Sequence, residues 1–153
     1  MANTYSQIYN HFVFAVQNRR SLIKSEWQEE LYKYITGCIT QHQCKLLSIG
    51  GMPDHVHILV GMNPCIAPTV LITDVKRSYA LWINKKFYRP GFFSWQKGYG
   101  VFSYAKSAIT NVSTYIEKQA LHHQKQTLQT EYLNILSHFG VEHDEKYIFH
   151  PVN

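Results

Sequence analysis

Hydrophobic residues at every second position, Val56, Ile58 and Val60, alternate with His55, His57 and Leu59 over residues 55–60. Side chains of a strand alternate between its two faces, so Val56, Ile58 and Val60 share one face and the two histidines share the other. The apolar face is expected to pack beneath helices. The preceding Gly50-Gly51 pair is typical of a turn, because glycine adopts backbone angles that other residues avoid. We therefore predict a turn that leads into a buried strand.

The elements before this strand follow from the same kind of pattern. Alternation predicts a strand over Tyr5–Val16, on which we interpret His11 as a hydrogen-bonded interior or edge histidine. Apolar residues at helical spacing predict a helix from Ser25, a candidate N-cap, to about Gln43. A strand beginning at Lys45–Ile49 then either forms a hairpin with the histidine strand or continues into it as one bent strand.

Helical and strand patterns also cover the second half of the chain. Pro68 fits the first position of a helix that runs to about Tyr88. Two short strands are predicted at residues 92–96 and 101–104. Helical spacing returns from Ser107, another candidate N-cap, to about Gln126, and again over residues 127–139, where Gly140 is expected to end the helix.

The order of these elements indicates an α+β fold. The predicted order is strand, helix, strands, helix, strands and helix. This order fits one mostly antiparallel sheet with helices packed on it, connected as a split βαβ motif. A chain of 153 residues typically folds as one domain, so we expect residues 1–153 to form a single unit.

The composition narrows the class of protein and of partner. A hydrophobic share of 45% with 16% charged residues is ordinary for a soluble globular protein. The net charge of +5 suggests an anionic partner. Four basic residues of the predicted Pro68–Tyr88 helix either contact phosphates or form a solvated outer face: Lys76, Arg77, Lys85 and Lys86.

The cysteines favour a cytoplasmic setting. Cys38, Cys44 and Cys65 form no Cys-X-X-Cys pair, which indicates reduced thiols. We interpret Cys38 as a core residue, and no further cysteine has suitable spacing to complete a metal site with His42 and Cys44. No signal peptide is visible, and no apolar run approaches the ~18–20 residues of a transmembrane helix.

Two pairs of residues carry candidate chemistry. The Cα atoms of His55 and His57 are expected about 6–7 Å apart, so both imidazoles can reach one metal ion, although a purely structural role is the alternative. Tyr115 and Gln119 are four apart on a predicted helix and project from one face. Two imidazoles favour zinc, manganese or another transition metal before magnesium. A metal that orients a phosphodiester and a tyrosine nucleophile would suit attack on phosphorus.

Three motifs resemble the single-tyrosine HUH transposases of bacterial insertion sequences, where HUH denotes His-hydrophobic-His. They are Pro53–Val60, Trp95–Gly100, and Tyr115–Gln119 followed by His122-His123. The resemblance extends from about Tyr5 to Tyr147. It implies the ferredoxin-like fold of HUH endonucleases, with residues 107–126 as the tyrosine-bearing helix.

The resemblance also implies residue roles. His55, His57 and Gln119 match the family's metal ligands for Mg²⁺ or Mn²⁺, and Tyr115 matches its nucleophile. Such enzymes cut single-stranded DNA near hairpins, keep a 5′-phosphotyrosine and free a 3′-hydroxyl. They form homodimers, in many of which one subunit's tyrosine helix serves the other's histidines. Lys118 departs from the family, because many members have asparagine immediately before the metal-binding glutamine.

Two other functions remain open at this point. One is a non-catalytic or domesticated protein that only binds DNA hairpins. The other is a metal phosphoesterase that uses activated water, with Tyr115 in a structural role. Metal-dependent cleavage separates the first from an enzyme, and a covalent protein–DNA adduct excludes the second.

Overall fold

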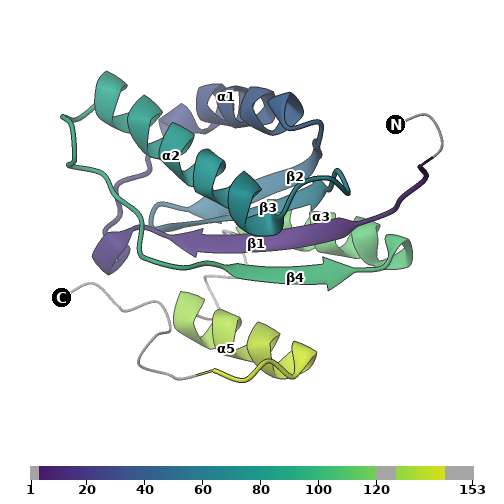
Figure 1. Cartoon of the computed structure of the whole chain (residues 1–153). Coiled ribbons are helices and arrows are strands. Elements are labelled where there is room, and N and C mark those ends of the chain that lie inside the picture. Colours follow the sequence, from purple (N-terminus) through teal and green to yellow (C-terminus); the bar gives the residue numbers. More distant parts are fainter. Residues whose placement is uncertain (1–3, 120–126, 144–153) are drawn as a thin grey trace.

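The computed structural model describes residues 4–119 and 127–143. Its centre is a four-stranded antiparallel sheet with the strand order β2-β3-β1-β4 (Figure 1). The strands are Tyr9–Ala15 (β1), Lys45–Met52 (β2), His55–Gly61 (β3) and Gly100–Tyr104 (β4). Because β3 lies between β1 and β2, the predicted split βαβ arrangement and the α+β class are confirmed.

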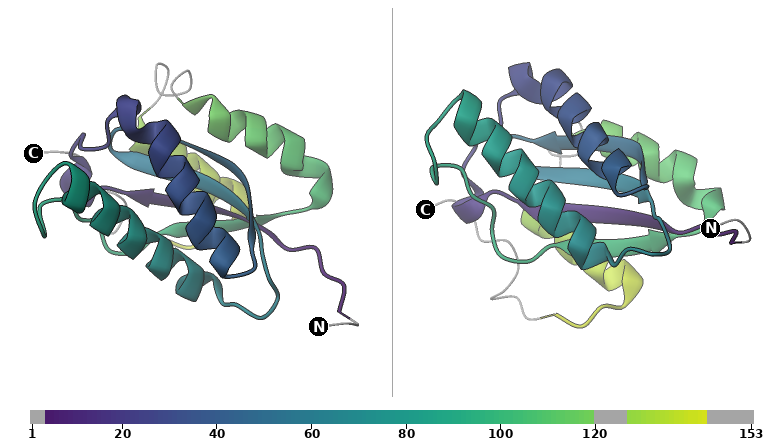
Figure 2. Two further views of the ribbon diagram at one scale, coloured as in Figure 1. Left: turned by 90° about the horizontal axis from the view of Figure 1, so that it is seen from above. Right: turned by 45° about the horizontal axis from the view of Figure 1, so that its top comes forward.

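Helices cover both faces of the sheet (Figures 1 and 2). The first face, here the α1/α2 face, carries α1 (Gln28–Gln41) and α2 (Pro68–Lys86). The second, the α3/α5 face, carries α3 (Ile109–Glu117) and α5 (Leu128–Phe139). None of the helices in the described ranges is both long enough and apolar enough to span a bilayer.

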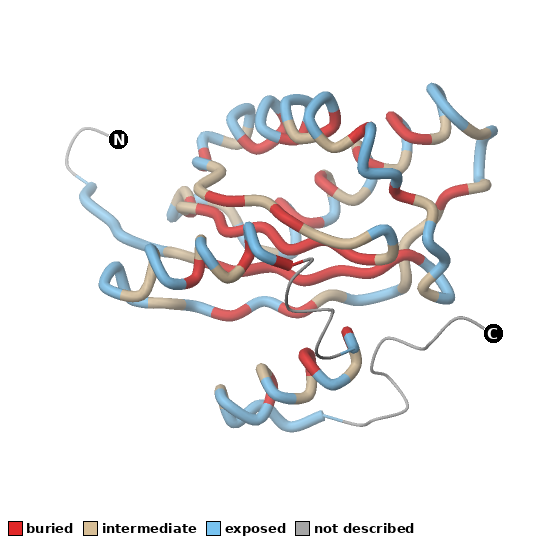
Figure 3. Tube along the Cα trace, turned by 180° about the vertical axis from the view of Figure 1, so that it is seen from behind, coloured by how far each residue is buried: buried red, intermediate tan, exposed pale blue. Residues whose placement is uncertain are grey.

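The main core lies on the α1/α2 face. Val56, Ile58 and Val60 of β3 pack there, as the alternating pattern predicts. In Figure 3 the central strands are buried along nearly their whole length. Smaller apolar clusters fill the α3/α5 face, where α5 contacts Val13 and Ala15 of β1. The polar face of β3 is therefore covered as well.

The predicted turn into β3 forms, but it lies after Gly50-Gly51 rather than at the two glycines, and the hairpin alternative is correct. Both glycines belong to β2, and the turn to β3 is formed by Pro53 and Asp54. A Cβ atom at Gly50 would overlap the carbonyl oxygen of Ile116 in α3. Gly50 therefore serves the close approach of α3 to the sheet rather than a change of chain direction.

The predicted strand at residues 92–96 does not form. Only Trp95 makes an isolated bridge, to Val16. The Trp95 ring packs edge-on against Phe14 and Phe93, and its Nε1 donates to the carbonyl oxygen of Lys76 at 2.8 Å. The aromatic residues of this segment fill the core, so the segment does not add a strand to the sheet edge.

Several element boundaries differ from the predicted ones. The first strand begins at Tyr9, not at Tyr5. Ser25 and Ser107 lie within short 3₁₀ turns and do not cap the helices that follow. The α3 helix ends at Glu117, and residues 120–126 of the predicted tyrosine helix lie outside the described residues.

The bounds of α5 agree with the prediction. Thr127 caps the helix by accepting from the backbone N–H of Thr130 at 3.2 Å. Gly140 ends it in the left-handed conformation, with φ of 64°. These two caps fix where α5 begins and ends beneath β1 and β4.

Candidate metal and tyrosine site

The two histidines of β3 lie on the α3/α5 face, as their spacing predicts. His55 and His57 are 1% and 0% exposed, and their ring centroids are 5.3 Å apart. A buried imidazole carries two polar nitrogens, and each needs a hydrogen-bond or metal partner. The surroundings of each ring show what those partners are.

Asp54 orients the ring of His55. Nδ1 of His55 lies 2.8 Å from the Asp54 carboxylate, which Arg19 also contacts at 3.2 Å. Burial alone would raise the pKa of Asp54, but the hydrogen bond from His55 and the charge of Arg19 hold that pKa below its ordinary value. A carboxylate only accepts, so Nδ1 carries the proton and Nε2 points toward Gln119, 3.3 Å from its Oε1.

His11 of β1 orients the ring of His57. Nε2 of His11 lies 2.8 Å from Nδ1 of His57, and the two rings stack with centroids 5.0 Å apart. Burial, with the neighbouring His57, lowers the pKa of His11 well below its ordinary value, so His11 is neutral. The prediction of a hydrogen-bonded interior histidine is confirmed. With Nδ1 engaged, Nε2 is the ligand atom of His57 as well.

Glu131 of α5 is the residue that connects the site. One oxygen, Oε1, lies 3.1 Å from Nε2 of His57. The other, Oε2, accepts from the hydroxyl of Tyr115 and from the amide of Gln119, the latter at 3.4 Å. Glu131 is 1% exposed, so this carboxylate is buried among polar partners from β3, α3 and the segment after α3.

Tyr115 stands over the histidines of its own chain. Its ring centroid is 6.1 Å from that of His57, at an interplanar angle of 82°. Burial, together with the hydrogen bond to Glu131, raises the pKa of Tyr115 above its ordinary value. The ring borders a cavity of about 340 Å³ between α3, α5 and the sheet. The structure thus brings together all four residues predicted for the site: His55, His57, Tyr115 and Gln119.

The donor set fits a divalent metal. The ligand atoms of His55, His57 and Glu131 all lie within 4.8 Å of one another, and the Gln119 amide adjoins them. Two imidazoles alone favoured transition metals before magnesium. The added carboxylate and amide oxygens are harder ligands, which suit Mn²⁺ or Mg²⁺ better than nitrogen donors alone.

Glu131 is the functional candidate that the sequence reasoning missed. A helical glutamate is usually solvated, and this one follows His57 by 74 residues. One signal does exist: with Leu128, Tyr132 and Ile135 it occupies successive positions of an apolar stripe. An acidic residue inside such a stripe must be buried with partners, which is what the structure shows.

The basic candidates for DNA contact lie on α2, across the sheet from the histidines. Lys76 donates to the carbonyl oxygens of Gln96 and Gly98 at 3.0 and 2.9 Å, so it anchors that loop. Arg77 pairs with Asp74 at 2.6 Å. Lys85 and Lys86 are exposed, and Lys86 pairs with Glu30. A role of these residues in DNA binding stays a prediction, and His122-His123 lie outside the described residues.

The chain belongs to the family of IS200-like transposases. The family model described as "Transposase IS200 like" matches residues 4–119, about three quarters of the chain. The match ends at Gln119, so Glu131 lies beyond it. No curated protein matches the chain.

Two solved structures share the fold. A putative transposase from Deinococcus radiodurans is 23% identical, with a TM-score of 0.62 over 76% of this chain and 94% of the other. A REP-associated tyrosine transposase bound to a REP hairpin is 14% identical, with a TM-score of 0.57 over 89% of this chain and 72% of the other. Both neighbours therefore share the α+β fold of this chain.

Proposed function

We propose that this transposase nicks and rejoins single-stranded DNA at hairpins, through a divalent metal and a 5′-phosphotyrosine intermediate. One observation carries the proposal: a single buried carboxylate, Glu131, links the hydroxyl of Tyr115 to the ring of His57. A tyrosine nucleophile needs a proton acceptor, and an acceptor is already in hydrogen-bond contact with it.

The chemistry is a transfer of one phosphodiester bond. The Tyr115 oxygen attacks phosphorus, its proton passes to Oε2 of Glu131, and the bond from phosphorus to the 3′-oxygen breaks. The leaving 3′-oxygen takes its proton from water. The products are a 5′-phosphotyrosine and a 3′-hydroxyl. Because the ester to tyrosine conserves the bond, attack by another 3′-hydroxyl rejoins the strand without an energy cofactor.

The histidine cluster holds the metal in this scheme. His55, His57, Gln119 and Glu131 form the ligand set for Mn²⁺ or Mg²⁺, and Asp54 and His11 fix the two rings. A bound divalent cation supplies the positive charge that polarises the scissile phosphodiester. Burial and the neighbouring Glu131 raise the pKa of Tyr115, so the resting nucleophile is a neutral phenol.

The proposed partner is DNA with a hairpin, bound by a homodimer. The REP-associated neighbour was solved with a REP hairpin, and the net charge of +5 suits a polyanion. Within one chain Tyr115 already lies beside its own histidines, so this arrangement supports attack in cis; exchange of tyrosine helices between subunits is the alternative. Lys85 and Lys86 are proposed backbone contacts.

A denaturing gel tests the function directly. Labelled single-stranded hairpin DNA is incubated with and without Mn²⁺, using wild type, Tyr115→Phe, and Tyr104→Phe as the control tyrosine from the same cavity. We expect a metal-dependent covalent adduct in wild type and Tyr104→Phe, and none in Tyr115→Phe. Hairpin binding without any adduct would instead support the hairpin-binding protein. Cleavage without an adduct would support the phosphoesterase.

A further inference from the structure

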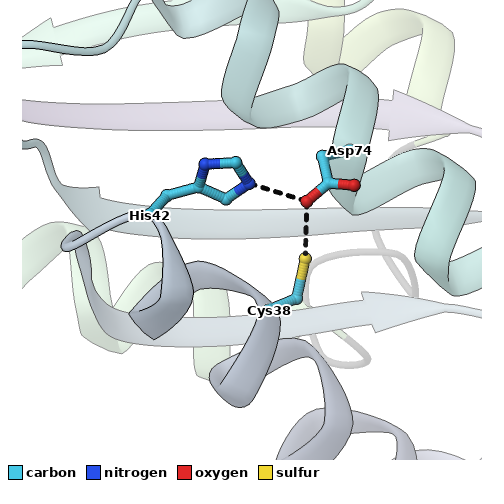
Figure 4. A group of neighbouring side chains, drawn as sticks. All are labelled: Cys38, His42 and Asp74. Carbon is cyan, nitrogen blue, oxygen red and sulfur yellow. Dashed lines mark hydrogen bonds and ion pairs between the residues drawn. The ribbon is translucent and has the colours of Figure 1, made fainter.

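A second group of metal-ligating side chains lies on the other side of the sheet. Cys38 of α1, His42 just after α1 and Asp74 of α2 converge at one point (Figure 4). Nε2 of His42 lies 2.6 Å from Oδ2 of Asp74, and Sγ of Cys38 lies 3.4 Å from the same oxygen. All three ligand atoms are within 4.8 Å of one another.

Helix geometry and helix packing produce this group. Cys38 and His42 are four residues apart, one helical turn, so both side chains lie on the same side of the chain. Asp74 comes from α2, which packs beside α1 on the same face of the sheet. Cys38 is 8% exposed, and the side chains of His42 and Asp74 are 25% and 23% exposed. The group is therefore half-buried and reachable by an ion from solvent.

We propose that Cys38, His42 and Asp74 bind Zn²⁺ and thereby clamp α1 to α2. Thiolate, imidazole and carboxylate are the three ligand types that zinc uses in proteins. The thiolate excludes Mg²⁺ as the preferred ion, because soft sulfur ligands select zinc over hard cations. This inference is independent of the proposed DNA chemistry.

The distances suit a tetrahedral ion after small movements. Zinc–ligand distances of about 2.0–2.3 Å place tetrahedral ligand atoms roughly 3–4 Å apart. The Cys38–Asp74 distance of 3.4 Å already fits, and the His42–Asp74 distance of 2.6 Å must open by several tenths of an ångström. Arg77 holds the other oxygen, Oδ1, at 2.6 Å, so Oδ2 remains the ligand atom. A water molecule would supply the fourth ligand.

The contacts of Cys38, His42 and Asp74 give less support to other roles. Among the contacts of the described residues, the Cys38 thiol donates to Asp74 and Ser78 and not to the His42 ring, so no Cys–His nucleophile pair is formed. Cys44 contacts the backbone carbonyl of His42 and stays outside the group. The remaining alternative is a hydrogen-bonded link between the helices that needs no ion.

Cobalt spectroscopy separates the zinc site from that alternative and from the histidine cluster. Co²⁺ bound by a thiolate shows a sulfur-to-metal charge-transfer band, and His55, His57, Gln119 and Glu131 supply no sulfur. We expect this band in the full-length wild type, its loss in Cys38→Ser, and its retention in Cys65→Ser, the exposed control cysteine. Absence of the band from wild type, or its persistence in Cys38→Ser, would overturn the proposal.

A second variant guards against misfolding of Cys38→Ser. His42→Asn alters a side chain that is already one-quarter exposed and keeps the thiol. Zinc affinity, measured by competition with a chromophoric chelator, should fall more than about tenfold. Loss of a residue that only hydrogen-bonds to a metal ligand already lowers metal affinity about 10–100-fold. Zinc should also raise the melting temperature of wild type by more than that of His42→Asn, because the histidine cluster can bind the ion in both proteins. Equal affinity in the two proteins would contradict the site.

Discussion

The two faces of the sheet carry two clusters that differ in how their residues are held. On the α3/α5 face, His55, His57 and Glu131 are at most 1% exposed, and the two rings are fixed by neighbours. On the α1/α2 face, the side chains of His42 and Asp74 are about one-quarter exposed. The first cluster is preorganised because its histidines lie on a central strand that α3 and α5 cover. The second cluster is assembled only by the packing of α1 against α2. Only the first has the fixed geometry that catalysis requires.

The largest expected difference between the faces is in DNA cleavage. His57→Ala removes a proposed metal ligand, so metal-dependent cleavage of hairpin DNA should fall to background. His42→Asn, on the opposite face, should leave the cleavage rate within about twofold, because the proposed zinc site touches no reacting group. Single-turnover rates against Mn²⁺ concentration measure both. A normal Mn²⁺ titration in His57→Ala would refute the assignment of this face.

Glu131→Gln should have the next largest effect. The amide keeps the size of the side chain but cannot take the proton of Tyr115, so the cleavage rate should fall about 10²–10⁴-fold, the usual contribution of a general base. Hairpin affinity, measured in a native gel, should not change. Glu117→Gln is the matched control, because Glu117 is exposed at the end of α3, where its carboxylate accepts from the hydroxyl of Ser48 and lies away from Tyr115 and the histidines. Equal rates in the two variants would count against a base role for Glu131.

The strand carrying the histidines was predictable because its signal is local. Period-two alternation placed His55 and His57 on one face, and α5 was bounded by Thr127 and Gly140. Tyr115 and Gln119 were also predicted to meet the histidines, although Gln119 lies past the end of α3 rather than on its face. Short-range spacing and cap chemistry therefore specified much of the sheet and each of the two residue pairs, whereas the meeting of the two pairs was an expectation from the resemblance to HUH transposases.

The rest depends on contacts between distant segments. Glu131 is 74 residues from His57, and Asp74 is 32 residues from His42, so no spacing rule connects them. The Gly50-Gly51 pair has the composition of a turn, and only the position of α3 explains why small residues stand in a strand there. Tertiary packing decides these features, and it is not encoded in a local pattern.

Glycine substitutions should affect the two faces with opposite signs. An alanine at Gly50 would push its Cβ into the backbone of α3, so Gly50→Ala should destabilise the fold by about 1–3 kcal/mol and also lower the cleavage rate. Gly37→Ala is the control on α1, where nothing lies within 4 Å of the added Cβ. It should stabilise the fold by about 0.5–1 kcal/mol. Urea unfolding of both variants measures the difference, and a neutral Gly50→Ala would show that α3 can move away.

The smallest expected effect concerns the helix cap that places Glu131. Thr127 accepts from the N–H of Thr130 at the start of α5, so Thr127→Ala should cost about 1 kcal/mol of folding free energy. Thr40→Ala is the control on α1, where the hydroxyl donates to the carbonyl oxygen of Thr36 and caps nothing. That change should be neutral or slightly stabilising, because such a bond competes weakly with the helix.

Since α5 holds Glu131 against Tyr115, loss of the cap should also increase hydrogen exchange in residues 128–131 and lower the cleavage rate severalfold. Unchanged exchange together with lower stability would mean that α5 is held by its packing on β1 and β4 and not by its first turn.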